Sequence, residues 1–233
     1  ALARAAATVA VWGTNPDNNA AAVEQLKAHG GEAEAWTCDV SDPDAVKARF
    51  GETLERFGRV DGCFANAGVS GRGERSFLDI GFDEWRRVLS VNLDGVYHTY
   101  QAVLRHMVDR AEAGDPGGRL VCVSSLASIS GAARSEHYAA SKGALNSMTF
   151  ALAVEFARYG ITANAILPGW IETDMTGDLM ANAKFQEAAG KRIPARRWGG
   201  PEDFGGIAVY LQSDASAYHT GQLLQIDGGY WRF

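Results

Sequence analysis

Two short apolar runs, Arg119-Leu-Val-Cys-Val-Ser124 and Thr162-Ala-Asn-Ala-Ile-Leu167, stand on either side of a longer segment of helical period over Ser135–Tyr159. Short runs of this kind predict buried strands, and the longer segment predicts a helix. A strand, a helix and a second strand in this order are typical of parallel strands joined by a crossover helix. The stretch therefore predicts an α/β fold.

The same alternation continues outward in both directions. Further strands are predicted at Thr8–Trp12, Glu34–Cys38, Asp61–Ala65 and Gln222–Ile226. Further helices are predicted at Asn18–His29, Asp42–Phe57, Phe82–Ala111 and Glu202–Gln212. The pattern favours a doubly wound parallel sheet with helices on both faces, which makes three layers.

Composition limits the class of protein. The chain has 233 residues, of which 46% are apolar and 21% charged, and this composition predicts one globular domain over residues 1–233. The net charge of −6 argues against nucleic acid or a membrane surface as a partner. The cysteines and histidines show no metal-ligand spacing, so we expect no metal. The absence of a signal peptide or a long apolar run predicts a cytoplasmic protein.

Three polar residues near the central strand indicate chemistry. Ser125 follows the strand Arg119–Ser124, where the carboxyl ends of parallel strands open onto a ligand crevice. Tyr138 and Lys142 are four residues apart, which places them on one face of the predicted helix. A nearby ammonium favours the phenolate form of a tyrosine and lowers its pKa toward the neutral range. Tyr138 is thus a candidate acid/base, although a pair at this spacing alone is more often a surface pair.

Further motifs accompany this pair. They are Asn92 within Ser-Val-Asn-Leu-Asp-Gly, the turn Ala65-Asn66-Ala67-Gly68, the turn Cys38-Asp39-Val40, the segment Pro168-Gly169-Trp170-Ile171-Glu172-Thr173 and the ending Ile226-Asp227-Gly228-Gly229-Tyr230. With them, the sequence resembles the short-chain dehydrogenase/reductase family, in its compact single-domain branch, from Ala1 to Phe233. The resemblance implies a Rossmann-type fold and hydride exchange between a nicotinamide cofactor and an alcohol or ketone.

The resemblance also implies roles for the four residues that match the family's catalytic set. Tyr138 would be the general acid/base, and Lys142 would lower its pKa and hold the nicotinamide ribose. Ser125 would orient the substrate carbonyl, and Asn92 would hold a water that links Lys142 to solvent.

The resemblance and the strand ends together imply a set of cofactor-binding residues. This set is Thr14, Asp39, Val40, Asn66, Ala67, Gly68, Tyr138, Lys142, Pro168, Gly169, Ile171 and Thr173. Structural alternatives stay open for three of them: Asp39 as a strand-end cap, Asn66 as a link between strands, and Thr173 as a helix cap. The cofactor is NAD(P)(H), with NADP favoured because Gly13 stands where an acid would select NAD.

The front of the chain lacks one expected feature. A dinucleotide-binding domain opens with a strand and a glycine-rich turn that meets the pyrophosphate, and no G-x-G-x-x-G occurs in this sequence. Residues 1–7 instead suggest the tail of a helix that leads into the strand Thr8–Trp12. We therefore expect the first strand and its turn to be missing from this sequence and to precede Ala1 in the natural protein.

Several expectations concern substrate and assembly. The stretch from 170 to 200 interrupts the strand and helix rhythm and is interpreted as a substrate lid, with a peripheral helix as the alternative. The substrate is a small alcohol or ketone of open identity, and the family resemblance implies a homo-oligomer, either a tetramer or a dimer. Two other functions compete with the enzyme: a non-catalytic dehydrogenase-like binding protein and an inactive truncated fragment.

Overall fold

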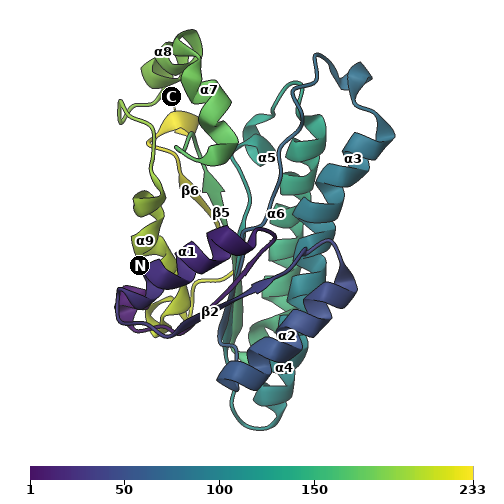
Figure 1. Ribbon diagram of the computed structural model, residues 1–233, viewed down its shortest axis with the longest axis vertical. Coiled ribbons are helices and arrows are strands. Elements are labelled where there is room, and N and C mark those ends of the chain that lie inside the picture. Colours follow the sequence, from purple (N-terminus) through teal and green to yellow (C-terminus); the bar gives the residue numbers. More distant parts are fainter. Residues whose placement is uncertain (233) are drawn as a thin grey trace.

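The computed structural model describes residues 1–232, and the side chains of all of these except 178 and 179. Its strands are all parallel (Figure 1). They are β1 (Val9–Gly13), β2 (Ala33–Thr37), β3 (Gly62–Ala65), β4 (Gly118–Val123), β5 (Ile161–Pro168) and β6 (Leu223–Ile226). Each lies within one residue, at either end, of a strand expected from the apolar runs. The predicted α/β class is confirmed.

Helices connect and cover these strands. They are α1 (Pro16–Lys27), α2 (Pro43–Phe57), α3 (Phe82–Leu89), α4 (Gly95–Glu112), α5 (Ala127–Ser130), α6 (Glu136–Phe156), α7 (Gly177–Ala181), α8 (Ala183–Arg192) and α9 (Gly205–Gln212). One expectation is wrong in detail, because the helix predicted over Phe82–Ala111 is not a continuous α-helix. A π-helical segment, Ser90–Asp94, joins α3 to α4.

The strands form two groups rather than one sheet. β1 pairs with β2, and the order in the second group is β3-β4-β5-β6. Among residues 1–232 no strand lies between β1 and β3. The doubly wound α/β fold with parallel strands and helices on both faces is confirmed, and its described strands make up two sheets.

The core has two sides, as three layers require. Along β4, Leu120 and Cys122 face one side and pack in a cluster with α4 and α6, whereas Val121 faces the other side and packs with α9. Leu145 of α6 is fully buried in the first cluster. In Figure 1, α1 and α9 lie on one side of the strands and α2, α4 and α6 on the other. None of the described helices is both long and apolar enough to cross a membrane.

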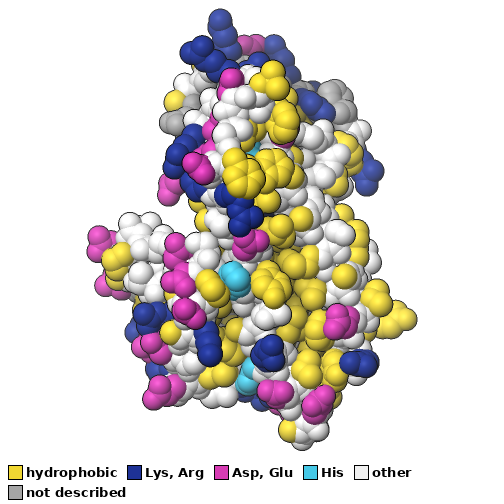
Figure 2. Space-filling model, turned by 90° about the vertical axis from the view of Figure 1, so that its right-hand side faces the viewer, with side chains coloured by type: hydrophobic (Ala, Val, Ile, Leu, Met, Phe, Trp, Pro, Cys, Tyr) yellow, Lys and Arg dark blue, Asp and Glu magenta, His cyan; other side chains and the backbone are white. Residues whose placement is uncertain are grey.

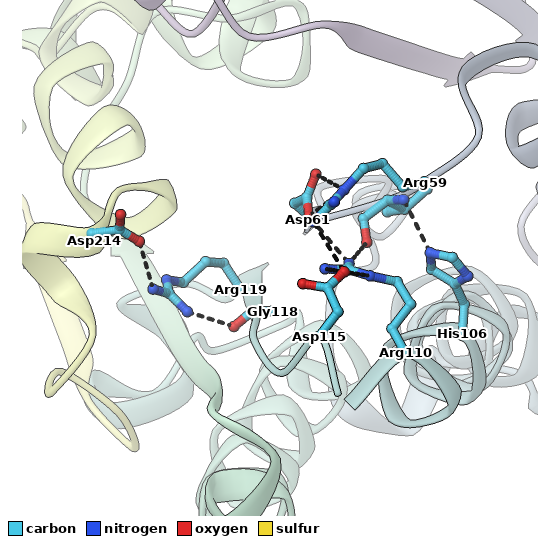
Figure 3. Close-up of polar contacts among 9 residues, drawn as sticks. Arg59, Asp61, His106, Arg110, Asp115, Gly118, Arg119 and Asp214 are labelled. Carbon is cyan, nitrogen blue, oxygen red and sulfur yellow. Dashed lines mark hydrogen bonds and ion pairs between the residues drawn. The ribbon is translucent and has the colours of Figure 1, made fainter. Parts of the chain in front are cut away.

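Charged residues close the amino-terminal end of the main sheet (Figure 3). Arg110 of α4 pairs with Asp61 at 3.1 Å and with Asp115 at 2.8 Å, while Arg119 of β4 lies 3.6 Å from Asp214. Arg110 also donates to the Val60 carbonyl at 3.1 Å. These groups bind one another and the backbone, so the opposite, carboxyl end of the strands is the end available for a ligand.

The segment from 170 to 200 is anchored by an aromatic cluster. The ring centroid of Trp170 lies 4.9 Å from that of Phe185 in α8, 5.5 Å from that of Trp198 and 6.3 Å from that of Tyr230. Edge-to-face and tilted contacts at these separations are favourable beyond the area they bury. The segment therefore packs α8 onto the carboxyl end of the sheet, beside the last strand.

Candidate active site

Three predicted residues meet at the carboxyl end of β4. Ser125 follows this strand, and α6 carries Tyr138 and Lys142 across the same end. The Lys142 ammonium donates to the Val123 carbonyl at 2.7 Å and lies 5.8 Å from the centroid of the Tyr138 ring. Lys142 is only 4% exposed, so its charge faces the phenol and the strand end with little competing water. The structure thus brings these predicted residues together.

Burial sets the protonation states of this group. It lowers the pKa of Lys142 from 10.5 to about 8, because the charged ammonium has lost most of its hydration. Burial also raises the pKa of Tyr138, and the Ser125 hydroxyl partly opposes this change by hydrogen bonding to the phenol. At neutral pH Tyr138 therefore carries its proton, and Lys142 is an ammonium close to its titration range.

Asn92 lies in the π-helical segment and is completely buried. Its side-chain oxygen accepts from the Val69 amide at 2.8 Å, and its Nδ2 donates to the Val69 carbonyl at 3.0 Å and to Ser141 Oγ at 3.1 Å. A π-helical insertion often marks a functional position because it re-aims side chains. Here it lets Asn92 hold the loop after Gly68 against α6.

The turn Asn66-Ala67-Gly68 lies directly over this group. A Cβ atom at Gly68 would be 3.3 Å from Asn92 Oδ1 and 3.4 Å from Lys142 Nζ, so glycine permits the close approach of the backbone. Asn66 and Ala67 are exposed. The role of Asn66 as a link between strands and its contact with a cofactor therefore both stay predictions.

The turn Asp39-Val40 follows β2 at the same end of the strands. Asp39 is exposed and uses one carboxylate oxygen to accept from the Ser41 amide at 2.9 Å and from the Ser41 hydroxyl at 2.7 Å. Val40 packs against Gly95, where a Cβ would lie 2.6 Å from Val40 Cγ2 and 3.3 Å from the Val40 carbonyl oxygen. The first residue of α4 thus fixes the position of this turn.

This contact leads to a prediction about Gly95→Ala. Replacing glycine by alanine in a helix ordinarily stabilises a protein by up to about 1 kcal/mol. At Gly95 we expect the opposite, a loss of about 1–3 kcal/mol in the free energy of unfolding, because the new methyl group overlaps Val40. Urea denaturation measures this change. Gly51→Ala in α2 is the matched control, since a Cβ there has no neighbour within 4 Å, and equal stabilisation by both substitutions would contradict the packing described.

The segment after β5 forms the other wall. Gly169 approaches the backbone of Asp227 so closely that a Cβ would lie 2.8 Å from the Asp227 Cα. Pro168 accepts from the Leu126 amide at 3.1 Å, which ties this wall to the loop after Ser125. Ile171 is buried.

Thr173 is exposed and begins the short helix Asp174–Thr176, as the alternative interpretation of this residue expected. Its amide donates to Thr176 Oγ1 at 3.1 Å. Thr173 therefore occupies the N-cap position of a short helix at the edge of the site, and its predicted contact with a cofactor stays a prediction.

The end of β1 has no acidic side chain, as the sequence indicated. A Cβ at Gly13 would lie 2.4 Å from Asn19 Oδ1, and Asn19 donates to the Gly13 carbonyl at 3.0 Å. Thr14 is exposed beside it, whereas the Asn15 side chain caps α1 by accepting from the Asp17 amide at 2.9 Å. The exposed Thr14 side chain is therefore available to a ligand at this strand end.

Two supporting contacts were not predicted from the sequence. The Ser124 hydroxyl donates to the Lys142 carbonyl at 2.9 Å, and Asn146 donates to the Ser128 hydroxyl at 2.8 Å. The first joins the end of β4 to α6 and the second joins α5 to α6, so the two fix Ser125 relative to Tyr138. In the sequence these contacts are indicated only by the polar residues themselves, which stand at positions where an α/β core is usually apolar.

Comparison with known proteins agrees with this architecture. The model of the enoyl-(acyl carrier protein) reductase family matches residues 1–231. The 3-oxoacyl-[acyl-carrier-protein] reductase FabG of Chlamydia pneumoniae is 36% identical over 96% of this chain and 86% of its own length. Gluconate 5-dehydrogenase of Gluconobacter oxydans is 34% identical over 98% of this chain and 86% of its own length.

A solved structure extends the comparison to three dimensions. The gluconate 5-dehydrogenase from Burkholderia cenocepacia J2315, crystallised in complex with NADP and tartrate, superposes with a TM-score of 0.92. It is 34% identical, and the match covers 100% of this chain and 88% of that one. Fold, site and relatives together define a nicotinamide-dependent oxidoreductase of Rossmann type. The chain belongs to the short-chain dehydrogenase/reductase family.

Proposed function

We propose that this protein transfers a hydride between NADP(H) and a small secondary alcohol or its ketone. The observation that carries the proposal is the joint position of Ser125, Tyr138 and Lys142 at the carboxyl end of β4, with a buried ammonium 5.8 Å from the phenol ring. A non-catalytic binding protein has no need of a charge buried at that cost. The two competing functions are not favoured by the relatives, which are named as dehydrogenases and reductases.

The residues at the strand ends fit a nicotinamide cofactor. Exposed groups of Thr14, Asp39, Asn66 and Ala67 follow three successive strands, as an extended dinucleotide requires. Gly68 and Gly169 let the backbone approach closely where a Cβ would meet its neighbours. The remaining proposed contacts are Val40, Tyr138, Lys142, Pro168, Ile171 and Thr173. When bound, the nicotinamide supplies or accepts the hydride.

The proton is handled by the chain itself. In the direction of reduction, Tyr138 donates the phenolic proton to the substrate oxygen as the carbonyl carbon gains the hydride. Ser125 hydrogen-bonds the same oxygen and stabilises its developing negative charge. Lys142 stabilises the resulting phenolate and binds the ribose hydroxyls, and Asn92 keeps the loop at Val69 closed against α6 and serves the proton relay.

The preference for NADP rests on the end of β1. An acid at the position of Gly13 would accept hydrogen bonds from the adenosine ribose and repel a 2′-phosphate. The contact between Gly13 and Asn19 leaves no room for such a side chain. The exposed Thr14 hydroxyl can donate to a phosphate at this place.

For the substrate we propose a hydroxylated carbon chain such as a sugar acid. Two relatives are named gluconate 5-dehydrogenase, and the solved structure of the one from Burkholderia cenocepacia holds NADP and tartrate. Arg72, on the loop after Gly68, has a side chain that is 73% exposed and can meet a carboxylate at the rim. We propose that the segment 170–200 is the lid over this substrate. Its aromatic cluster holds it at the carboxyl end of the sheet, and Met175 within it is half exposed and so available to a substrate.

Steady-state kinetics tests the proposed function. The protein is assayed for oxidation of NADPH and of NADH with 5-keto-D-gluconate, with a neutral cyclic ketone and with an acetoacetyl thioester. We expect the highest kcat/KM for NADPH with the keto acid. A higher value for the thioester would move the substrate to the class named for the reductase of Chlamydia pneumoniae, and no turnover of either cofactor with any of the three would contradict the proposal.

We also propose that the enzyme is a homo-oligomer. Tyr97 on α4 and Phe150 and Val154 on α6 are exposed, and Val154 is 84% exposed. Figure 2 shows hydrophobic side chains gathered on the side of the molecule where α2, α3 and α4 lie in Figure 1. Large exposed apolar areas commonly mark protein interfaces, and a dimer or a tetramer would bury this one.

A further inference from the structure

A second group of polar side chains lies behind the candidate active site. Glu74 belongs to the loop after Gly68, Glu84 to α3, and His137 to the first turn of α6, directly before Tyr138. One ligand-type atom from each of the three side chains lies within 4.8 Å of the other two. Two carboxylates and an imidazole that meet from three separate elements form a donor set typical of protein metal sites.

Burial leaves these side chains short of partners. His137 is 0% exposed, and neither of its ring nitrogens has a hydrogen-bond partner among the described residues. The same holds for the buried oxygen Oε2 of Glu74. A buried polar atom without a partner costs about 1–3 kcal/mol, so His137 Nε2 and Glu74 Oε2, which both border Gly71, indicate a common ligand.

The loop backbone approaches His137 closely from the side of Glu74. A Cβ atom at Gly71 would lie 2.8 Å from His137 Nε2 and 2.9 Å from Glu74 Oε2. Glycine is thus required where the loop passes over the imidazole. Because Gly71 has no side chain, nothing separates His137 Nε2 from Glu74 Oε2 at this place.

The charge of the group favours a cation. Arg87 donates to both carboxylate oxygens of Glu84, with Nη2 at 2.6 Å from Oε1 and Nε at 2.8 Å from Oε2. Arg72 approaches Glu84 at 3.4 Å, but its side chain is 73% exposed and its charge is largely screened. The two carboxylates outnumber the one guanidinium that binds Glu84 closely, and the remaining negative charge favours a cation over an anion.

The separation of two of the ligand atoms agrees with a tetrahedral ion. Ligand atoms about 2.1 Å from a tetrahedral metal are about 3.4 Å from one another, and His137 Nε2 lies 3.6 Å from Glu84 Oε1. We propose that Glu74, Glu84 and His137 bind a divalent metal ion of the Zn²⁺ or Mn²⁺ class. Because His137 is completely buried, this ion does not reach the substrate, and it fastens the loop after Gly68 and α3 to the start of α6.

Metal content tests the proposal without reference to activity. Chelator-treated protein is dialysed against micromolar ZnCl₂ or MnCl₂, and the bound metal is counted by plasma mass spectrometry. We expect one ion per chain and a melting temperature that rises with metal concentration, because the ion binds only the folded state. Glu74→Gln and His137→Gln are expected to lose the ion, whereas His29→Gln, which replaces an exposed histidine at the end of α1, is expected to keep it.

Two results would overturn the proposal. One is a wild-type protein that takes up neither Zn²⁺ nor Mn²⁺ under these conditions. The other is full metal content in Glu74→Gln, which changes a half-buried loop side chain and is expected to fold even if His137→Gln does not. Circular dichroism of each variant establishes that the compared proteins are folded.

Discussion

Replacing Tyr138 by phenylalanine is expected to lower kcat/KM for ketone reduction by about 10² to 10⁴-fold, while the affinity for NADPH changes little. The substitution removes one hydroxyl group and keeps the ring that faces Lys142, so it takes away the proton donor without opening a cavity. Because burial raises the pKa of Tyr138, the wild-type phenol is protonated at neutral pH and ready to donate. Steady-state kinetics and NADPH fluorescence titration measure the two quantities.

Tyr97→Phe is the matched control for this variant. Tyr97 is a half-exposed phenol on α4, remote in role from the proposed chemistry, and its loss should leave kcat/KM unchanged. Equal rates for wild type and Tyr138→Phe would remove Tyr138 from its proposed role. A large loss of NADPH affinity in the same variant would show that the phenolic hydroxyl acts mainly in the proposed cofactor contact of Tyr138 rather than as the proton donor.

Lys142→Met is expected to stabilise the protein at pH 7 and at the same time abolish its activity. Burial lowers the pKa of Lys142 from 10.5 to about 8, so holding the ammonium in the folded state costs about 3 kcal/mol below pH 8. The variant also loses the hydrogen bond to the Val123 carbonyl, worth about 1 kcal/mol. We therefore expect a net gain of about 2 kcal/mol in the free energy of unfolding, measured in urea.

The change of this stability gain with pH is a second, independent test of the prediction. Between pH 8 and 10.5 the unfolded wild-type chain holds the Lys142 proton more tightly than the folded chain, so wild-type stability rises with pH across that window. The advantage of Lys142→Met should shrink across the same window. Lys47→Met, at an exposed position on α2, is the control and should show neither effect, and a destabilised Lys142→Met at pH 7 would contradict the account.

Much of the fold follows from local sequence. The strands were predictable because each is a short apolar run bounded by turn residues, and β4 to α6 to β5 illustrates this well. The π-helical segment at Ser90–Asp94 was not predicted, because the apolar pattern over Phe82–Ala111 was interpreted as one continuous α-helix. The break between β1 and β3 was not predicted, because strand pairing joins residues that lie far apart in the sequence.

Some features of the candidate site could be predicted from the sequence and others could not. Tyr138 and Lys142 could be paired because four residues along a helix is a fixed geometry, and Ser125 because it ends a strand. The hydrogen bonds between the Asn92 side chain and the Val69 backbone could not be predicted. They join a helix to a loop that is distant in the sequence, and no local pattern indicates that the two pack together.

The group of Glu74, Glu84 and His137 could not be predicted from the sequence for the same reason. These residues lie on a loop and two helices with no regular spacing between them, so the sequence alone predicted no metal at all. The signal that reveals them is burial without a partner, and it exists only in three dimensions.

The central claim is that a nicotinamide cofactor binds across the strand ends, in contact with Lys142. Isothermal titration of NADPH into wild type, Tyr138→Phe and Lys142→Met tests it most directly. The account predicts one NADPH per chain in wild type and in Tyr138→Phe, and binding weakened by about tenfold in Lys142→Met through loss of a charged hydrogen bond. No binding of NADPH or NADH to the wild type, or equal affinity in Lys142→Met, would contradict it.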